Sequence, residues 1–283
     1  MSFDTIAVIG AGTMGSGIAQ LLAQNKYSTL LYDAHAEALT RGLDGIHKRL
    51  QQQEQKGRLS SIQHKEATHA LTTTTDLAAL QTAGLLIEAI PERLDLKKQV
   101  FAQLDRIAQG DSVLASNTSG LDIDQLAMAT QRPAQVIGLH FFNPPPLMPL
   151  IEIARGSATS DRTFAAVHAL ALSLGKTPIA VANRPGFAVN RILFPMINEA
   201  IYALAEGVAS AEDIDRAMQL GASHPLGPLA LADFVGLDVT LDILKALERD
   251  LADPKYRACP LLCEKVERGE LGRKSGRGFF TYS

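Results

Sequence analysis

Three side chains in the middle of the chain are candidates for proton-transfer chemistry. Ser119 follows the apolar run "VLAS", and His140 ends a second apolar run, "AQVIGLH". Glu152 lies inside a third run, "LIEIA", where a carboxylate is costly to bury unless it is paired. Imidazole exchanges protons near neutral pH, and a neighbouring carboxylate stabilises its charged form. The three residues are therefore either a catalytic set or a structural His–Glu pair at strand ends of a buried sheet.

The runs that hold these residues belong to a series in the first part of the chain. Short apolar runs alternate there with amphipathic stretches, and the runs cover residues 5–10, 27–33, 83–90, 112–116, 134–140 and 150–154. Near-continuous apolar strands separated by helices are typical of a parallel sheet covered on both faces. We therefore predict an α/β fold with a Rossmann-type doubly wound sheet. Ligands bind such sheets outside the carboxyl ends of the strands, where His140 is expected.

The N-terminal turn has the spacing of a dinucleotide-binding site. Its G-x-G-x-x-G follows a predicted strand and opens a helix: Gly10 permits the tight turn, Gly12 lets a pyrophosphate approach, and Gly15 allows close helix packing. Asp33 ends the second strand, where its carboxylate can bond both ribose hydroxyls and would repel a 2′-phosphate. NAD is thus favoured over NADP, while FAD shares the fingerprint and stays open. The predicted cofactor-binding residues of this region are Gly10, Gly12, Thr13, Met14, Gly15 and Asp33.

Residues 42–72 interrupt the alternation with polar sequence. They indicate two polar helices broken near Lys56 and Gly57, so we predict a helical hairpin inserted into the first domain. Between His47 and Glu66 there are five Lys or Arg residues and two Glu. On composition alone, this segment is a solvated surface element.

The composition changes after about residue 183. A proline-glycine turn precedes a long apolar helix at 187–204, and Pro195 is expected to kink it. Further helical stretches follow, with a capping pattern from Ser210 to Asp213. No strand pattern appears before the tail. We therefore predict two domains, a Rossmann domain over residues 1–183 and an all-helical domain over residues 184–283.

Composition excludes several classes of protein. The chain has 283 residues, of which 46 % are hydrophobic and 20 % are charged, and its net charge of −3 provides no basic footprint for nucleic acid. No apolar run approaches the ~18 residues of a membrane span, and we expect no signal peptide. Cys259 and Cys263, with no His nearby, favour neither a disulfide framework nor a metal site. We expect reduced thiols in a cytoplasmic protein.

Several motifs, in order from Ile6 to Tyr282, resemble the short-chain L-3-hydroxyacyl-CoA dehydrogenases of the 3-hydroxybutyryl-CoA dehydrogenase type. The stretches are "IAVIGAGTMGSGIA", "ASNTSGLDI", "GLHFFNPPPLMPLIEI", "PGFAVNRILFPMINEAI", "LGASHPLGPLALADFVGLD" and "GRKSGRGFF". The combination of HFFNP with a downstream PGF-x-x-NR is highly specific. The sequence departs from the family at Pro149, where members often have Lys, and its "PPP" is heavier in proline than the common pattern.

The resemblance implies a reaction and a set of residues for it. The reaction is oxidation of an (S)-3-hydroxyacyl-CoA to the 3-oxoacyl-CoA with NAD. His140 would be the base and Glu152 its partner, while Ser119 and Asn190 would contact the substrate. The implied contacts on the cofactor side are Glu92, Lys97, Ser119 and Asn143. Members of the family pair through the second domain, so a homodimer is expected.

Coenzyme A gives the basic hairpin a second interpretation. Its phosphorylated ADP end has several negative charges, which the basic residues of the hairpin could bind. The candidates are Lys48, Arg49, Lys56, Arg58 and Lys65. Two alternatives stay open: a related dehydrogenase of a sugar acid such as gulonate, which keeps the His–Glu pair, and a non-catalytic crystallin-like protein on the same scaffold. The acyl chain length and the pathway are not predicted.

Overall fold

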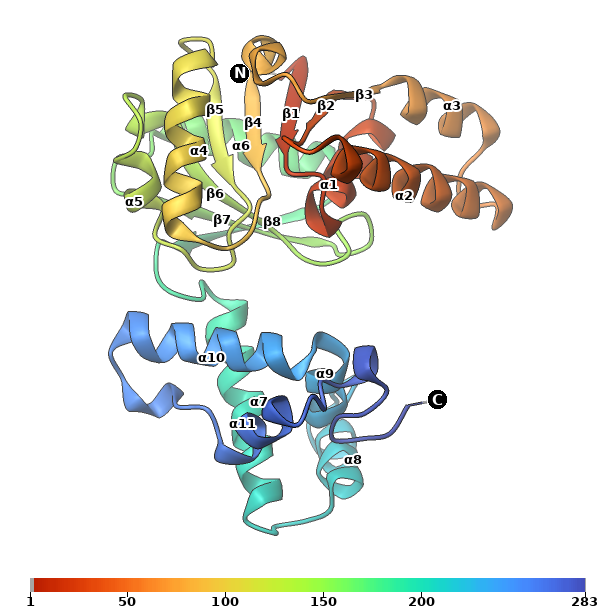
Figure 1. Cartoon of the computed structure of the whole chain (residues 1–283), viewed down its shortest axis with the longest axis vertical. Coiled ribbons are helices and arrows are strands. Elements are labelled where there is room, and N and C mark those ends of the chain that lie inside the picture. The colour runs from red at the N-terminus through yellow and green to blue at the C-terminus, as the bar shows by residue number, and fades with distance from the viewer. Residues whose placement is uncertain (1–2, 283) are drawn as a thin grey trace. The chain divides into compact units, whose positions relative to one another are not determined.

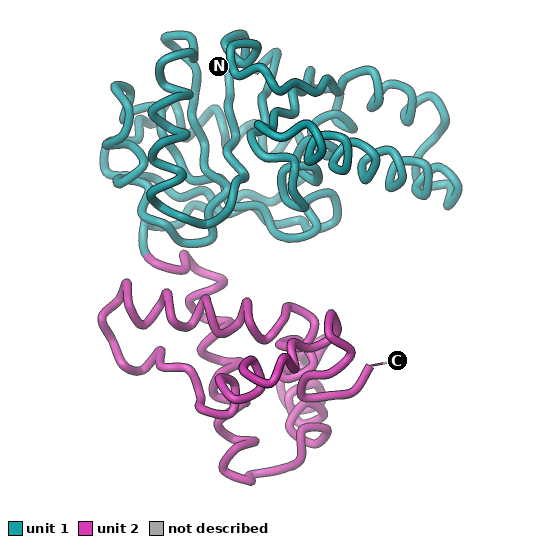
Figure 2. The backbone as a smooth tube through the Cα atoms, viewed as in Figure 1, with its two compact units in different colours: residues 1–184 teal, residues 185–283 magenta. Residues whose placement is uncertain are grey.

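The computed structural model describes residues 3–282 of the chain. The chain divides between Arg184 and Pro185 into two compact units, which Figure 2 distinguishes by colour. This division falls one residue after the boundary predicted at 183. Each unit has its own hydrophobic core.

Unit 1 is built on an eight-stranded sheet whose order is β3-β2-β1-β4-β5-β6-β7-β8. The strands are β1 (Thr5–Ile9), β2 (Ser28–Tyr32), β3 (Leu71–Thr74), β4 (Leu85–Glu88), β5 (Val113–Ser116), β6 (Val136–Phe141), β7 (Leu150–Arg155) and β8 (Thr177–Ala182). From β3 to β6 all neighbouring strands are parallel, which confirms the predicted doubly wound sheet. Strands β2 and β3 follow β1 on one side of the sheet, whereas β4, β5 and β6 follow on the other side. This topological switch point lies between β1 and β4, so a ligand crevice is expected at their carboxyl ends.

Two features of the sheet differ from the prediction. β7 is antiparallel to β6, so the sheet is mixed rather than wholly parallel. The segment 142–149 between them is too short for the crossover that a parallel pair requires. The edge strands β3 and β8 were not predicted: β3 is mostly threonine, and the apolar residues of β8 follow a proline and were not recognised as a strand. Residues of β8 are mostly exposed, and three of the four residues of β3 are threonines.

Helices cover both faces of the sheet, as predicted. Figure 1 shows α4 (Leu94–Ile107) in front of it and α6 (Asp161–Ser173) behind it. α1 (Thr13–Gln24) packs against β1 and β2, and α5 (Ile123–Ala127) packs against β6. Short 3₁₀ segments occupy residues 77–82 and 133–135. The fully buried side chains of α1 and α6 join those of the strands in one core cluster.

The predicted helical hairpin consists of α2 (Ala36–Gln55) and α3 (Ser61–His69), and it projects away from the sheet in Figure 1. α2 starts six residues before the predicted limit at 42, and Leu39 near its start is buried in the core cluster of unit 1. The break between the helices lies at Gly57, which has a φ of 66°. A hydrogen bond of 2.6 Å between Nδ1 of His64 and Oε2 of Glu54 joins the two helices.

Unit 2 is all helical among its described residues. Its helices are α7 (Val189–Ala205), α8 (Ala211–Gly221), α9 (Pro228–Val235), α10 (Leu237–Leu251) and α11 (Pro260–Glu267), with 3₁₀ turns at 254–256 and 273–275. The predicted cap is present, since the Ser210 hydroxyl accepts a hydrogen bond of 3.1 Å from the Asp213 N–H. Within residues 3–282, no helix is long and apolar enough to cross a membrane.

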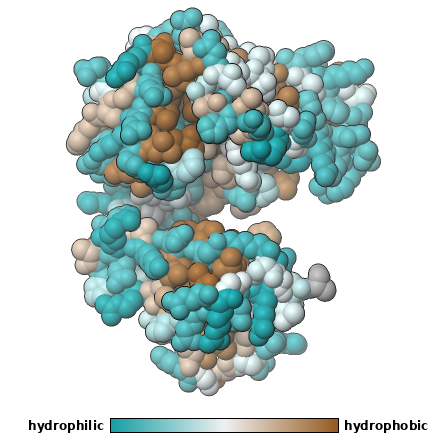
Figure 3. All heavy atoms as spheres, viewed as in Figure 1, coloured by the Kyte–Doolittle hydropathy of each residue, from teal (hydrophilic) through white to brown (hydrophobic). Residues whose placement is uncertain are grey.

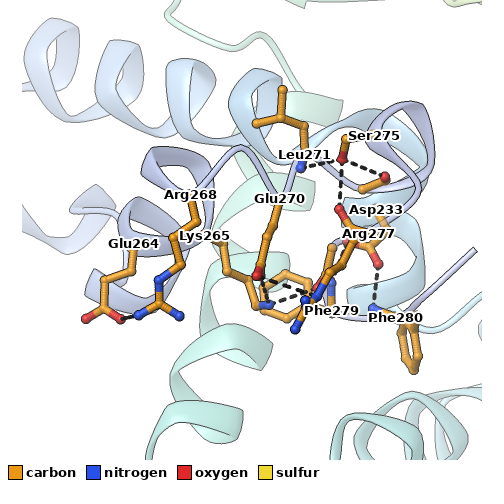
Figure 4. Close-up of polar contacts among 12 residues, drawn as sticks. Asp233, Glu264, Lys265, Arg268, Glu270, Leu271, Ser275, Arg277, Phe279 and Phe280 are labelled. Atoms are coloured by element: carbon orange, nitrogen blue, oxygen red, sulfur yellow. Dashed lines mark hydrogen bonds and ion pairs between the residues drawn. The ribbon is translucent and has the colours of Figure 1, made fainter.

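The C-terminal tail is held by a buried carboxylate of α9. Figure 4 shows the tail beside Asp233, whose side chain is 1 % exposed. Its two oxygens accept hydrogen bonds of 2.9 Å from the Phe279 and Phe280 N–H groups, and Oδ2 accepts one of 3.0 Å from the Tyr282 hydroxyl. An added Cβ at Gly278 would lie 2.0 Å from Asp233 Oδ1, so glycine is required there. Asp233 therefore fixes the tail on unit 2.

Replacing Asp233 with Asn is expected to destabilise unit 2 by about 1–3 kcal/mol, because the side chain keeps its volume but loses an acceptor for buried donors. Thermal unfolding and carboxypeptidase digestion of the tail would measure the effect. Asp242→Asn, on the exposed face of α10, is the matched control. A tail that stays resistant to digestion in Asp233→Asn would contradict this role.

Candidate active site

His140 and Glu152 lie directly opposite each other in the antiparallel pair of β6 and β7. Nδ1 of His140 is 2.8 Å from Oε2 of Glu152, and the two residues are 8 % and 1 % exposed. A carboxylate only accepts hydrogen bonds, so Nδ1 holds the hydrogen and Nε2 is the basic nitrogen of the neutral ring. The imidazole also lies against Phe142, with ring centroids 4.4 Å apart. The pair can accept a proton at Nε2 and stabilise the resulting imidazolium.

Ser119 lies in the turn after β5, where Glu92 organises the backbone. Oε1 of Glu92 accepts hydrogen bonds from the Thr118 hydroxyl at 2.5 Å, from the Ser119 N–H at 2.8 Å and from the Ser119 hydroxyl at 3.2 Å. Oδ1 of Asn117, two residues before Ser119, accepts a hydrogen bond of 3.0 Å from the Phe141 N–H, next to His140. These bonds couple the Ser119 turn to the carboxyl ends of β4 and β6.

The other carboxylate oxygen of Glu92 is paired with a buried lysine. Lys97 of α4 is 0 % exposed, and its Nζ lies 2.9 Å from both Glu92 Oε2 and Glu88 Oε1. Burial alone lowers the pKa of Lys97, but the charges of the two carboxylates outweigh it and raise the pKa. Burial alone raises the pKa of Glu92, yet the Lys97 charge and the Thr118 and Ser119 bonds hold it below its usual value. Lys97 and Glu92 are thus charged at neutral pH.

These contacts change the interpretation of Lys97. Its ammonium is enclosed between two carboxylates, so a direct cofactor contact of the kind that the resemblance implies is not available in this structure. Glu92, whose side chain is 39 % exposed, is open to such a contact. We therefore infer that Lys97 holds the Glu92 carboxylate in position through their ion pair.

The glycine-rich turn fits a dinucleotide. An added Cβ at Gly10 would lie 2.8 Å from the Ala89 carbonyl oxygen, and one at Gly15 would lie 1.7 Å from that of Gly10. An added Cβ at Gly12, at the N-terminus of α1, would meet nothing within 4 Å. Gly12 therefore borders open space at the positive end of a helix, which suits a pyrophosphate.

Asp33 is held beside the glycine-rich turn by two backbone hydrogen bonds. Oδ2 of Asp33 accepts a hydrogen bond of 2.9 Å from the Ala11 N–H, and Oδ1 accepts one of 3.0 Å from the His35 N–H. The carboxylate is thereby fixed at the carboxyl end of β2, beside the glycine turn, with acceptor capacity for ribose hydroxyls. Thr13 is exposed, and Met14 is half-buried against the core.

A cavity of about 350 Å³ lies between α1, α2 and the proline-rich loop after β6. Its basic residues are Arg49, Lys56 and Arg58, and Thr13 and Asn143 also line it. Nε of Arg49 donates a hydrogen bond of 2.6 Å to Gln20 of α1, which fixes the guanidinium. Three of the five basic candidates of the hairpin therefore meet in one cavity, together with two predicted cofactor residues.

The remaining candidates lie elsewhere. Lys48 is exposed on α2 and does not line this cavity, and Lys65 lines a separate one of about 230 Å³ near His64. Asn190 lies in the first turn of α7 in unit 2 and is 8 % exposed. No group of three or more His, Cys, Asp or Glu among the described residues is arranged to hold a metal ion.

Sequence reasoning missed Glu88, Asn117 and Thr118. Glu88 stands in "LLIEAI", an acid in an apolar strand, which is the same signal that identified Glu152. Asn117 and Thr118 were visible in the "SNTS" turn, but their contacts join segments far apart in the chain. Only the fold shows that these residues support Ser119 and His140.

Both units of the chain match one family of known proteins. Residues 5–184 match the family described as 3-hydroxyacyl-CoA dehydrogenase, NAD binding domain, and residues 186–282 match its C-terminal domain. A probable 3-hydroxybutyryl-CoA dehydrogenase of Bacillus subtilis is 48 % identical over 282 residues, which cover 100 % of this chain and 98 % of that protein. The 3-hydroxybutyryl-CoA dehydrogenase of Clostridioides difficile is 46 % identical over 278 residues, covering 98 % and 99 %. The crystal structure of (S)-3-hydroxybutyryl-CoA dehydrogenase from Ralstonia eutropha matches with a TM-score of 0.96 and 46 % identity, covering 100 % of both chains.

Proposed function

The chain belongs to the 3-hydroxyacyl-CoA dehydrogenase family, and we propose that it interconverts a short-chain (S)-3-hydroxyacyl-CoA, such as 3-hydroxybutyryl-CoA, with the 3-oxoacyl-CoA. NAD is its cofactor. The observation that supports the chemistry best is the buried hydrogen bond of 2.8 Å between His140 and Glu152. A buried imidazole held by a carboxylate is suited to general acid–base catalysis of an alcohol and ketone pair.

The residues of the glycine turn and Asp33 would hold the dinucleotide, with Glu92 and Asn143 toward its reactive end. Bound NAD⁺ would supply a two-electron acceptor for the hydrogen on C3 of the substrate. His140 would accept the hydroxyl proton at Nε2, and Glu152 would stabilise the imidazolium through Nδ1–H. In the reductive direction, the protonated His140 would return the proton to the carbonyl oxygen.

Ser119 and Asn190 would orient the substrate. The Ser119 hydroxyl would hydrogen-bond the reacting oxygen, and the Glu92 contacts support its turn. Asn190, from α7, would help place the thioester side of the substrate. The Ser119 contact would fix the reacting oxygen relative to the base, which is the main requirement for rapid proton transfer.

Substrate length can be tested with acyl-CoA substrates of C4, C8 and C16 chains. The relatives are named for a four-carbon substrate, so we expect the highest kcat/KM with the C4 compound. A clear preference for C16 would retain the reaction but reject the short-chain assignment.

The basic cavity supports a site for the phosphorylated end of coenzyme A. Arg49, Lys56 and Arg58 place three cationic side chains around one cavity. We propose that they bind the phosphates of the substrate and that Lys48 and Lys65, which lie outside it, contribute less. Side-chain ammonium and guanidinium groups are the usual partners of phosphate.

Lys56→Glu is expected to raise the KM for acetoacetyl-CoA by about tenfold or more, since a charge reversal replaces attraction by repulsion near phosphate. kcat should change little. A substrate truncated to the pantetheine arm, which lacks those phosphates, should show a much smaller change. Lys48→Glu, which lies on α2 but outside the cavity, is the matched comparison. Equal effects of Lys56→Glu on both substrates would argue against the phosphate site.

We also propose a homodimer through unit 2 and a cytoplasmic location. Several large apolar side chains of unit 2 are exposed on the single chain, including Ile192 of α7 at 71 %, Leu220 of α8 at 75 % and Phe234 of α9 at 61 %. Figure 3 shows apolar surface on the visible face of this unit. Exposed apolar surface of this kind is typical of protein interfaces, and isologous pairing is the commonest way to cover it.

A further inference from the structure

Glu88 and Lys97 form an ion pair in the interior of unit 1 whose position suggests a purpose beyond folding. Both side chains are 0 % exposed, and Lys97 Nζ lies 2.9 Å from Glu88 Oε1. Burial raises the pKa of Glu88, and the Lys97 charge opposes that rise. Buried ion pairs are weak contributors to stability, because apolar residues of similar volume are often equally good or better. Stability alone therefore does not explain why Glu88 and Lys97 are buried at this position, whereas a role in the function of the site would.

The Glu88–Lys97 pair lies at the topological switch point of the sheet, between β1 and β4. Glu88 is the last residue of β4, and the sheet registers set it beside Ile9 of β1 and Ser116 of β5. Its Oε2 accepts a hydrogen bond of 2.6 Å from the Ser116 hydroxyl, and its Oε1 accepts one of 2.7 Å from the Ile90 N–H. Glu88 is thus fixed by three strands at the crevice where ligands of such sheets bind.

A continuous series of contacts leads from Glu88 to Ser119. Glu88 holds the Lys97 ammonium, which in turn holds Oε2 of Glu92 at 2.9 Å. Oε1 of Glu92 then accepts the hydrogen bonds from the N–H and hydroxyl of Ser119. Oε2 of Glu92 therefore contacts the buried Lys97, and Oε1 contacts the Ser119 turn.

We propose that Glu88 is a positioning residue: it fixes Lys97, through Lys97 it orients Glu92, and through Glu92 it sets the direction of the Ser119 hydroxyl. The inference rests on the proposed function, in which Ser119 contacts the reacting oxygen. Without Glu88, the ammonium would draw Glu92 inward or leave it loosely held. The Ser119 turn would then lose its fixed geometry although the fold remains.

The first test is Glu88→Gln, which keeps the size of the side chain and removes its charge. We expect kcat with acetoacetyl-CoA to fall by about 10–100-fold, the usual effect of losing a residue that orients a reacting group, while the KM for acyl-CoA changes little. Asp105→Asn is the matched control, since it disrupts another mostly buried ion pair, with Arg132, whose residues contact none of the candidate site. This control should keep the wild-type kcat.

The second test separates positioning from stability. Glu88→Gln with Lys97→Met removes both buried charges, so the free energy of unfolding should recover relative to Glu88→Gln. kcat should remain low, because Glu92 still lacks its anchor. Recovery of kcat together with stability, or a wild-type kcat in Glu88→Gln, would overturn the inference. If Glu88→Gln does not fold, a wild-type kcat in the double variant would still overturn the inference.

The same assays distinguish this inference from the proposed function. A wild-type protein that is inactive with acetoacetyl-CoA would reject the function itself. An active wild type with an unaffected Glu88→Gln would reject only the role of Glu88. NADH binding, followed by fluorescence, should change much less than kcat in both variants, because Asp33 and Gly12, which would hold the ribose and the pyrophosphate, make none of the contacts of the cluster.

Discussion

His140→Gln is expected to lower kcat by ~10²–10⁴-fold, the usual contribution of a general base. Glutamine keeps a polar side chain of similar length but cannot accept the substrate proton. Glu152 would then have no imidazolium to stabilise. Steady-state kinetics in both directions with acetoacetyl-CoA and 3-hydroxybutyryl-CoA would measure the loss.

Cofactor affinity should be little changed in His140→Gln, because the glycine turn and Asp33 lie at the ends of β1 and β2, and β4 and β5 separate these strands from β6. His168→Gln, in α6, is the matched control, since its ring contacts Phe164 and lies outside the candidate site. That variant should keep its kcat. Near-normal kcat in His140→Gln, with the protein shown to be folded, would reject the assignment of the base.

Gly12→Ala is expected to weaken NADH binding by about tenfold or more, which corresponds to about 1.4 kcal/mol, without destabilising the protein. The new methyl group would meet no atom within 4 Å, and the φ of −68° at Gly12 suits alanine. The free energy of unfolding should therefore stay the same or rise slightly. The methyl group would, however, occupy the space that a pyrophosphate needs at the N-terminus of α1. Fluorescence titration with NADH and thermal unfolding without cofactor would measure the two quantities.

Gly15→Ala provides the contrast to Gly12→Ala. Its Cβ would lie 1.7 Å from the Gly10 carbonyl oxygen, so the backbone has to move, and we expect a destabilisation of about 2 kcal/mol or more. The two substitutions add the same atom to one motif, yet one should affect binding and the other folding. Unchanged NADH affinity in Gly12→Ala would contradict the proposed cradle for the pyrophosphate.

The central sheet and the dinucleotide turn could be predicted because their signals are local. A buried strand needs a continuous apolar run, and the glycine turn needs its glycines within one short segment. Strand β3, with three threonines, gave no such signal, because edge strands tolerate polar residues, and the short apolar run of β8 was not recognised as a strand. The antiparallel direction of β7 was visible only as a short connection after β6, and it is this direction that sets His140 opposite Glu152.

The buried residues that hold Glu92, namely Glu88 and Lys97, were harder to predict because their contacts join segments that are distant in the sequence. Glu88 and Glu152 present the same pattern, an acid in an apolar strand, and the pattern does not say which partner satisfies each. Lys97 lies on the buried face of α4 together with Phe101 and Leu104, although the sequence analysis assigned it only a contact with the cofactor. Which residue compensates its charge follows only from the register of β4 with β1 and β5.

The most direct test of the central claim is the absorbance of NADH during incubation of the wild-type protein with acetoacetyl-CoA, compared with free acetoacetate and with the oxidised form of a sugar acid such as gulonate. The proposal predicts rapid NADH consumption with the CoA thioester and little with either free acid, because the His140–Glu152 pair would supply the proton and the basic cavity would hold the CoA phosphates. Faster turnover of the sugar acid, or no consumption of NADH with acetoacetyl-CoA, would contradict the proposed activity.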